Sequence, residues 1–176
     1  MKVEILVLCS FFAALTGVCS MVSVPLPFTP VQINLATFAV FLSGGLLGKK
    51  YGSISQIVYI LIGLAGAPVF QGFTSGAASL VGPTGGYLIG YVTAAFLTGL
   101  ITEKASFKGR FIVGCSVGMI SCYLLGTARF VMLTGVPVWA ALGYCVFPFI
   151  PGDAIKIAAA STIIKRLAHA RILVRD

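Results

Sequence analysis

The sequence predicts an all-α membrane protein with six transmembrane helices, and two properties of the chain carry this prediction. Hydrophobic residues make up 59% and charged residues only 9% of the 176 residues, whereas roughly a quarter of the residues in a typical soluble domain are charged. Apolar stretches also recur along the whole chain, separated by short segments rich in Gly, Pro, Lys and Arg. Because so few charges cannot cover a surface that faces water, we expect a single domain embedded in lipid.

A membrane-spanning helix needs about 20 mostly apolar residues. The Gly, Pro and Lys residues between the apolar stretches set the expected helix boundaries. Gly and Lys residues end the second stretch, Pro68 ends the third, and Pro83 opens the fourth. Glu4 and the length of the first stretch are unlike a cleaved signal peptide, so we keep it as a helix. The six predicted spans cover residues 5–24, 31–47, 54–69, 84–102, 111–133 and 152–167.

Basic residues orient these spans, because short cytoplasmic loops collect Lys and Arg. Ten of the twelve cations fall on one side if the helices alternate, and the opposite loops, residues 25–30 and 70–83, carry none. The sequence therefore predicts a multi-pass protein of the cell membrane with both termini in the cytoplasm. The same placement explains the net charge of +8 without a nucleic-acid partner.

The C-terminal third is interrupted by Pro148 and by Pro151-Gly152. From the outer end of the fifth span, the chain must cross the membrane an odd number of times to place Lys165 inside. A single crossing fits the length, so residues 138–149 are expected to form a short outer-side helix before the last span.

Three segments on the outer side differ from plain lipid-facing helix. In the first, three prolines within residues 25–30 favour a stiff, extended backbone. This segment is either a lid over a cavity or a simple connector. In the second, Gly85 permits close approach of backbone, and Tyr87 lies one turn into the fourth helix. Tyr87 either faces a ligand or anchors the helix at the membrane interface.

The third segment carries two charges at membrane depth. Asp153 and Lys156 are three residues apart, so they share one face of a helix. Charged groups within a membrane usually point into a cavity or pair with each other. Asp153 is either a ligand acceptor or a helix N-cap, and Lys156 either meets a ligand carboxylate or orients Asp153. Alternatively, the two residues form a purely structural pair, or Lys156 extends its charge toward the membrane surface. Arg129, near the outer end of the fifth helix, either pairs with Asp153, meets an acidic ligand or reaches lipid headgroups.

Cys9, Ala13 and Gly17 form a stripe of small residues that lets helices approach closely. The stripe packs either within the chain or against a partner protein. The five cysteines form no C-x-x-C pair and a single histidine, His169, is present, so we expect no metal site and no cofactor. The same inventory supplies no convincing catalytic group, which argues against an enzyme.

Together these motifs resemble the BioY family. The resemblance rests on Pro27-Phe28-Thr29 with Gln32, on residues 65–70, on residues 82–90, and on residues 148–156, in family order from about residue 13 to residue 168. It implies a six-helix subunit that captures biotin from outside the cell. It also implies a membrane coupling subunit and a pair of cytoplasmic ATPases as partners. The sequence contains no Walker-type motif, so we do not expect this chain to hydrolyse ATP itself.

The resemblance also suggests roles for particular residues. Tyr87, Asp153 and Lys156 fall on motif positions associated with the biotin pocket, and the stripe Cys9–Ala13–Gly17 looks like the surface for the coupling subunit. Biotin has an apolar bicyclic body, a ureido group and a carboxylate. Tyr87 and Phe28 would supply an aromatic wall, Asp153 an acceptor, and Lys156 or Arg129 a cation, but an apolar or aromatic residue is usual in the family where Arg129 stands. The expected site residues are Phe28, Thr29, Gln32, Gly85, Tyr87, Arg129, Asp153 and Lys156. The alternative function is a self-sufficient secondary carrier for biotin or a related small carboxylate.

Overall fold

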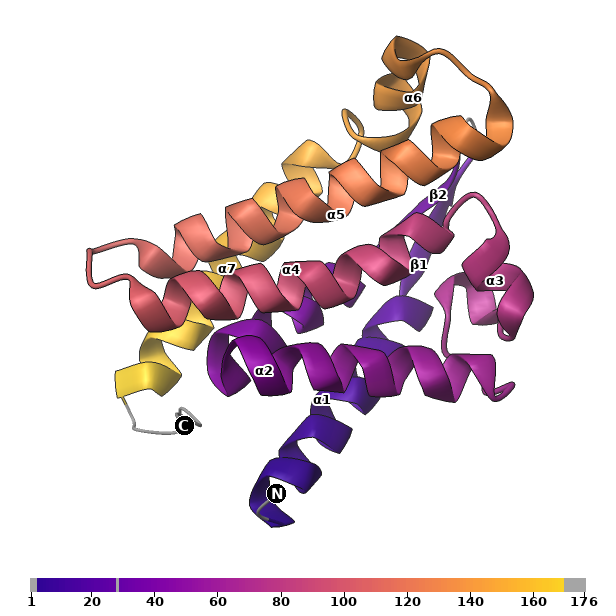
Figure 1. Ribbon diagram of the computed structural model, residues 1–176. Coiled ribbons are helices and arrows are strands. Elements are labelled where there is room, and N and C mark those ends of the chain that lie inside the picture. Colours follow the sequence, from indigo (N-terminus) through magenta and orange to yellow (C-terminus); the bar gives the residue numbers. More distant parts are fainter. Residues whose placement is uncertain (1–2, 28, 170–176) are drawn as a thin grey trace.

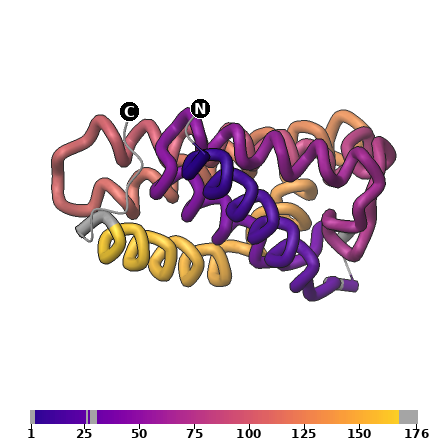
Figure 2. The backbone as a smooth tube through the Cα atoms, turned by 90° about the horizontal axis from the view of Figure 1, so that it is seen from below, coloured from indigo at the N-terminus to yellow at the C-terminus, as the bar shows by residue number. Residues whose placement is uncertain are grey.

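The structure is a computed structural model that describes residues 3–27 and 29–169. Helices dominate it, and Figure 1 shows α4 (Gly85–Lys104) and α5 (Arg110–Thr134) as two long neighbouring helices. Helix α2 (Ala36–Leu64) packs on α4, and α7 (Ile150–His169) packs on α2 and α5. Figure 2 shows α1 (Val3–Met21) lying obliquely across this bundle. The expectation of a mostly helical membrane fold is confirmed.

Apolar helices of spanning length support the membrane assignment. In the described part of the chain, α1, α4 and α5 are each long and apolar enough to cross a membrane. Helix α6 (Val138–Cys145) and α7 form a pair bent by 54° that meets the same requirement as one broken span. The short helix expected over residues 138–149 is therefore present and ends at Cys145.

Residues 23–34 depart from the prediction of an all-helical chain. They form an antiparallel hairpin of β1 (Ser23–Leu26) and β2 (Thr29–Asn34), in which Val24 lies opposite Ile33. The first two predicted spans were thus wrong at residues 23–24 and 31–34. β-Branched residues favour strands, and hydropathy alone does not distinguish an apolar strand from an apolar helix end. Helix α2 begins only at Ala36, whose N–H donates to the Asn34 side chain at 3.0 Å.

Helix α2 contains a sharp break at Gly48, where φ is +78° and ψ is 178°. This conformation is essentially restricted to glycine. The two arms of α2 fold back on each other at this break. Gly52 in the second arm lies so close to Gly44 in the first that a Cβ on Gly52 would be 2.7 Å from the Cα of Gly44. The Nε2 of Gln56 in the second arm also donates to Ser43 Oγ in the first at 2.9 Å. The break lies where the sequence predicts a loop between the second and third spans.

The loop expected between the third and fourth spans contains short helices. It holds η1 (Gln71–Phe73) and α3 (Ala77–Val81), after α2 has ended at Leu64 rather than Val69. Figure 1 places the hairpin, α3 and α6 toward one end of the molecule. The break in α2, the α4–α5 connection and the C-terminal end of α7 lie toward the other end.

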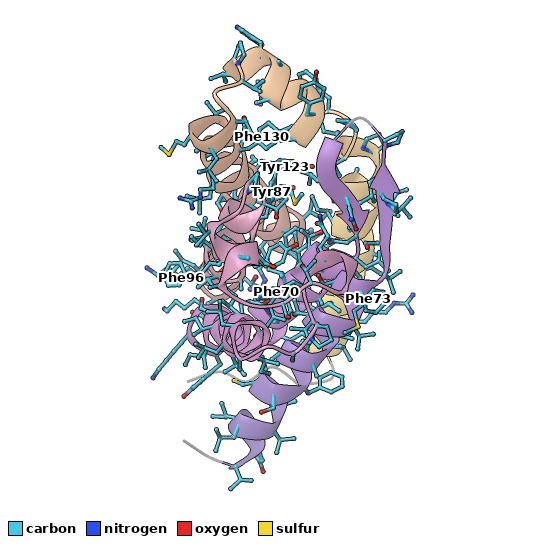
Figure 3. All side chains as sticks on the ribbon, turned by 90° about the vertical axis from the view of Figure 1, so that its right-hand side faces the viewer. Phe70, Phe73, Tyr87, Phe96, Tyr123 and Phe130 are labelled. Carbon is cyan, nitrogen blue, oxygen red and sulfur yellow. The ribbon has the colours of Figure 1, made fainter. Side chains whose placement is uncertain are left out.

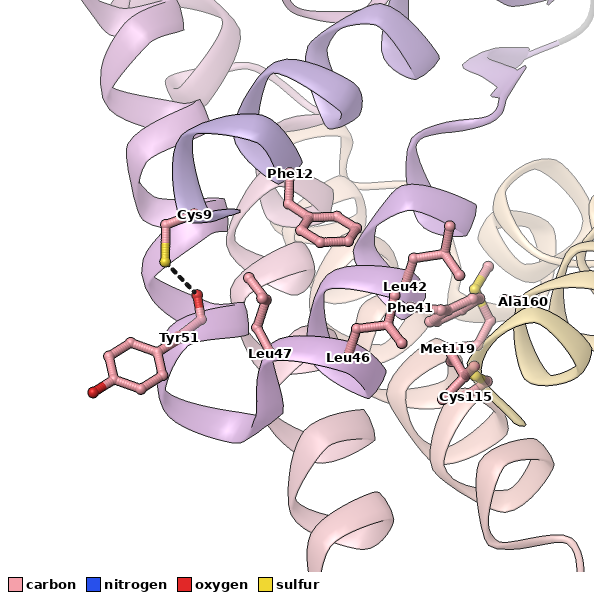
Figure 4. Packing of buried hydrophobic residues seen from close by; sticks show 11 residues of the cluster. Cys9, Phe12, Phe41, Leu42, Leu46, Leu47, Tyr51, Cys115, Met119 and Ala160 are labelled. Atoms are coloured by element: carbon pink, nitrogen blue, oxygen red, sulfur yellow. Dashed lines mark hydrogen bonds between the residues drawn. The ribbon is translucent and has the colours of Figure 1, made fainter. Parts of the chain in front are cut away.

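Buried apolar residues fill the bundle on the side of α1 and α2. Figure 4 shows Phe12 of α1 close to the α2 residues Leu42 and Leu46. Met119 and Cys115 extend this cluster to α5, and Ala160 extends it to α7. The cluster therefore fixes α7 against the bundle, and the first turns of α7 carry the charged pair predicted from the sequence.

Candidate functional site

The charged pair lies in the interior of the molecule. Asp153 and Lys156 expose only 4% and 9% of their surface. Lys156 Nζ donates to Asp153 Oδ1 at 2.7 Å and to Thr37 Oγ1, on α2, at 3.4 Å. Separating two charges from water is costly unless they are paired and hydrogen-bonded, and this arrangement meets both conditions. The N-cap alternative therefore does not explain the side chain of Asp153, which bonds to Lys156 instead.

A third helix holds the other carboxylate oxygen. The hydroxyl of Tyr123, on α5, donates to Asp153 Oδ2. The two oxygens of one carboxylate are thus held by different helices, and its orientation is fixed. Sequence reasoning missed Tyr123, because a single tyrosine in an apolar helix does not reveal which way it points.

These groups line a small cavity between the hairpin and the helices. The cavity has a volume of about 40 Å³, and Asp153 and Lys156 are the charged residues among those described that line it. The other lining residues are neutral. They are Val31, Gln32, Asn34, Thr37, Gln71, Tyr87, Tyr91, Met119, Tyr123, Cys145 and Phe149.

A larger cavity of about 480 Å³ adjoins the first and shares Gln32, Gln71, Tyr87 and Tyr91 with it. We call this larger space the vestibule. Its remaining lining is rich in hydroxyl groups and contains no charged side chain among the described residues. That lining consists of Ser20, Phe70, Thr74, Ser75, Ala78, Ser79, Gly82, Pro83, Thr84 and Leu88.

Tyr87 stands at the boundary between the two cavities. Its hydroxyl donates to the Cys145 carbonyl at 3.1 Å. The Tyr87 ring packs directly against Gly126, so any side chain at position 126 would displace the ring. Figure 3 shows Tyr87 and Tyr123 near each other in the interior, below Phe130 in that view. Tyr87 therefore belongs to the cavity wall rather than to a lipid-facing anchor.

Of the other predicted site residues, some line the cavities and others do not. Gln32 lines both cavities. Gly85 opens α4, and a Cβ there would clash with the Leu80 carbonyl, which gives this glycine a packing role. Phe28 and the side chain of Thr29 lie outside the described residues.

Arg129 does not join the charged pair. Its guanidinium Nη2 donates to the Val81 carbonyl at 2.7 Å, at the end of α3. It is absent from the described linings of both cavities. Neither pairing with Asp153 nor contact with a ligand is supported, and Arg129 instead ties α5 to α3.

The stripe of small residues on α1 packs inside the chain. Cys9 and Ala13 are buried, and the Cys9 thiol donates to the Tyr51 carbonyl at 3.6 Å. A Cβ on Gly17 would stand 3.4 Å from Val69. This packing favours the internal alternative for the stripe. The opposite, exposed face of α1 carries large apolar residues such as Phe11 and Val18.

Asn34 and Gln71 were also missed as site residues. Asn34 Nδ2 donates to Gln71 Oε1 at 3.3 Å, and this contact links β2 to η1 where the two cavities meet. Each is an isolated amide next to a long apolar stretch, and that signal could have identified them.

The fold and the site define a class: a helical protein with membrane-spanning segments and an internal cavity that contains a buried ion pair. The BioY family model matches residues 1–172. A biotin transporter BioY from Thermotoga maritima is 40% identical over 92% of this chain and 94% of the relative. A probable biotin transporter BioY from Pyrococcus horikoshii is 38% identical over 95% and 98%. This chain belongs to the BioY family, a family of transport proteins rather than enzymes.

A solved structure shares the whole architecture. The crystal structure of the S-component for biotin from an ECF-type ABC transporter superposes with a TM-score of 0.86 at 33% identity. The match covers 96% of this chain and 92% of that one. The similarity therefore extends over nearly the whole of both chains.

Proposed function

We propose that this chain is the biotin-binding membrane subunit of a vitamin importer and captures biotin in the cavity around Asp153. One observation carries the proposal: a buried, hydrogen-bonded Asp153–Lys156 pair faces a cavity in a member of the BioY family. Ligand sites combine mostly apolar walls with a few placed polar groups. The relatives that share this architecture are named for biotin.

The chemistry of the cavity fits the parts of biotin. Asp153 accepts hydrogen bonds, as the two N–H groups of the ureido ring require. Lys156 already bonds to Asp153 and Thr37, which supports an orienting role for Lys156 rather than pairing with the ligand carboxylate. Tyr87, Met119 and Phe149 offer apolar surface for the bicyclic body.

The size of the cavity indicates how the ligand is accommodated. Pockets for small ligands have volumes of roughly 300–1,000 Å³, far above the cavity of about 40 Å³. The vestibule of about 480 Å³ supplies the missing space if the shared residues separate. Biotin then reaches from Asp153 into the vestibule, where hydroxyl groups solvate its carboxylate tail.

A six-span topology with both termini in the cytoplasm completes the proposal. The break at Gly48 divides α2 into two arms, and α6 with α7 forms one bent span, so six crossings account for the helices. Lys49, Lys108 and Lys165 belong to the end opposite the cavities, where the α2 break, the α4–α5 connection and the end of α7 lie. Biotin would therefore enter from outside the cell.

The proposal includes partner subunits. The structural neighbour is a component of an ECF-type ABC transporter, which supports a membrane coupling subunit and an ATPase pair as partners of this chain. Uptake of biotin into vesicles by the chain alone, without ATPases, would favour a self-sufficient carrier instead.

The decisive experiment is equilibrium binding of biotin to the purified chain in detergent, with thiamine and riboflavin as controls. We expect saturable binding of biotin and none of the two other vitamins. A folded protein that binds no biotin would contradict the proposal.

A further inference from the structure

Tyr123 lies between two spaces of opposite character. On one side is the cavity that contains Asp153 and Lys156. On the other is an apolar groove of about 610 Å³ on α5 and α6, and Tyr123 is the described residue common to both linings. The rest of the groove consists of Ile120, Leu124, Thr127, Ala128, Val131, Met132, Val138, Leu142 and Val146.

The composition and exposure of the groove indicate that it faces the hydrocarbon of the membrane. Its residues belong to α5 and to the bent α6–α7 pair, which are of spanning length and composition. Leu124 and Met132 expose 66% and 79% of their surface, as expected for side chains in contact with lipid. The ring of Tyr123 therefore separates a polar cavity from lipid.

The hydroxyl of Tyr123 serves the polar side of this boundary. It donates to Asp153 Oδ2, while Lys156 holds Oδ1 at 2.7 Å. A carboxylate held at both oxygens by different helices presents its remaining lone pairs in a fixed direction. Loss of the hydroxyl would leave Asp153 held from its own helix alone.

We propose that Tyr123 is a positioning residue for the ligand, whose hydroxyl orients Asp153 and whose ring closes the cavity toward the lipid. This inference rests on the proposed biotin function. Tyr123 need not touch biotin, because the hydroxyl acts through the carboxylate and the ring acts as a barrier.

A double-mutant cycle tests the role of the hydroxyl. Tyr123→Phe retains the ring and should weaken biotin binding by about ten- to 150-fold, the range expected for the loss of one hydrogen bond to a charged group. In an Asp153→Asn background, Tyr123→Phe should weaken biotin binding by less than about twofold. The carboxylate that the Tyr123 hydroxyl orients is no longer present in that background. Binding is measured at equilibrium in detergent, and Tyr144→Phe, at an exposed tyrosine on α6, is the matched control.

The outcomes separate this inference from the proposed function. An unchanged affinity of Tyr123→Phe, or an equal loss in both backgrounds, would overturn the orienting role. A wild-type chain that binds no biotin would instead refute the proposed function itself.

A hydrocarbon probe tests the role of the ring. In Tyr123→Ala the cavity opens to the groove, so added decane should compete with biotin and lower its apparent affinity severalfold. Wild type and Tyr123→Phe should be insensitive to decane. Equal sensitivity in all three proteins, or none in the folded Ala variant, would overturn the closing role.

Discussion

At the scale of single residues, the site is organised around one carboxylate in a low-dielectric interior. Asp153 bonds to Tyr123 and Lys156, and Lys156 bonds in turn to Thr37. Breaking a buried ion pair by removing one partner typically costs about 3–5 kcal/mol, because an uncompensated charge remains. Replacing either residue would therefore also affect the fold, so the stability and the biotin affinity of each variant must be measured together.

We expect Asp153→Ala to weaken biotin binding by more than about tenfold, since at least one charged hydrogen bond, worth about 1.5–3 kcal/mol, is lost. Equilibrium binding measures the effect, and thermal unfolding in detergent confirms that the variant is folded. A folded Asp153→Ala protein with wild-type affinity would show that the carboxylate only stabilises the bundle.

Gly126→Ala tests the placement of Tyr87. The added methyl group would occupy the position of the Tyr87 ring, so we expect the ring to shift and biotin affinity to fall severalfold. Gly143→Ala on α6 is a matched control, because a Cβ there meets no atom within 4 Å. Equal affinities in the two variants would argue that the Tyr87 ring is not part of the site.

At the scale of elements, the reversal of α2 depends on a contact with α4. Glu103 Oε1 accepts the Lys49 N–H at 2.9 Å, and its other oxygen pairs with Lys49 Nζ at 3.2 Å. The first N–H groups of a helix lack partners within it, so Glu103 acts as a cap supplied by a neighbouring helix. Gly48 leaves room for this carboxylate.

We expect Gly48→Ala to destabilise the protein by more than Gly66→Ala. Both positions have positive φ, at +78° and +105°, which costs an L-residue about 1–3 kcal/mol. A Cβ at Gly48 would also clash with Glu103, whereas a Cβ at Gly66 meets nothing within 4 Å. Thermal unfolding in detergent compares them, and equal losses would mean that the Glu103 contact contributes nothing.

The sequence allowed the helices and the charged pair to be predicted, but not the hairpin. Asp153 and Lys156 were identifiable because ionisable residues at membrane depth are rare. The strands at residues 23–34 were not, because pairing of Ser23 with Asn34 is a tertiary contact that local hydropathy does not encode. Tyr123 and Arg129 show the same limit: which way a side chain points from a helix depends on neighbours far away in the sequence.

At the scale of the whole molecule, the two ends differ in charge and shape. The hairpin, α3 and α6 gather at the end with the cavities, and the α2 break and the α4–α5 connection lie at the other end. This polarity is what an importer subunit needs, since ligand arrives from one side and cytoplasmic partners act from the other.

We expect a membrane-impermeant maleimide to label Ala77→Cys but not Lys108→Cys in intact cells. Both positions are exposed, at the start of α3 and in the α4–α5 connection. Labelling of Lys108→Cys after the membrane is permeabilised is the control for reactivity. The reverse pattern would invert the proposed orientation.

The small volume of the inner cavity has a kinetic consequence. If biotin binds beside Asp153, as proposed, a chamber of about 40 Å³ is too small to hold it. Capture would then have to wait for the residues shared with the vestibule, Gln32, Gln71, Tyr87 and Tyr91, to separate. Association would then level off as biotin concentration rises, at a ceiling equal to the opening frequency of the protein. The same closed packing would retain the vitamin once it is inside, so slow entry and long residence would have one structural origin.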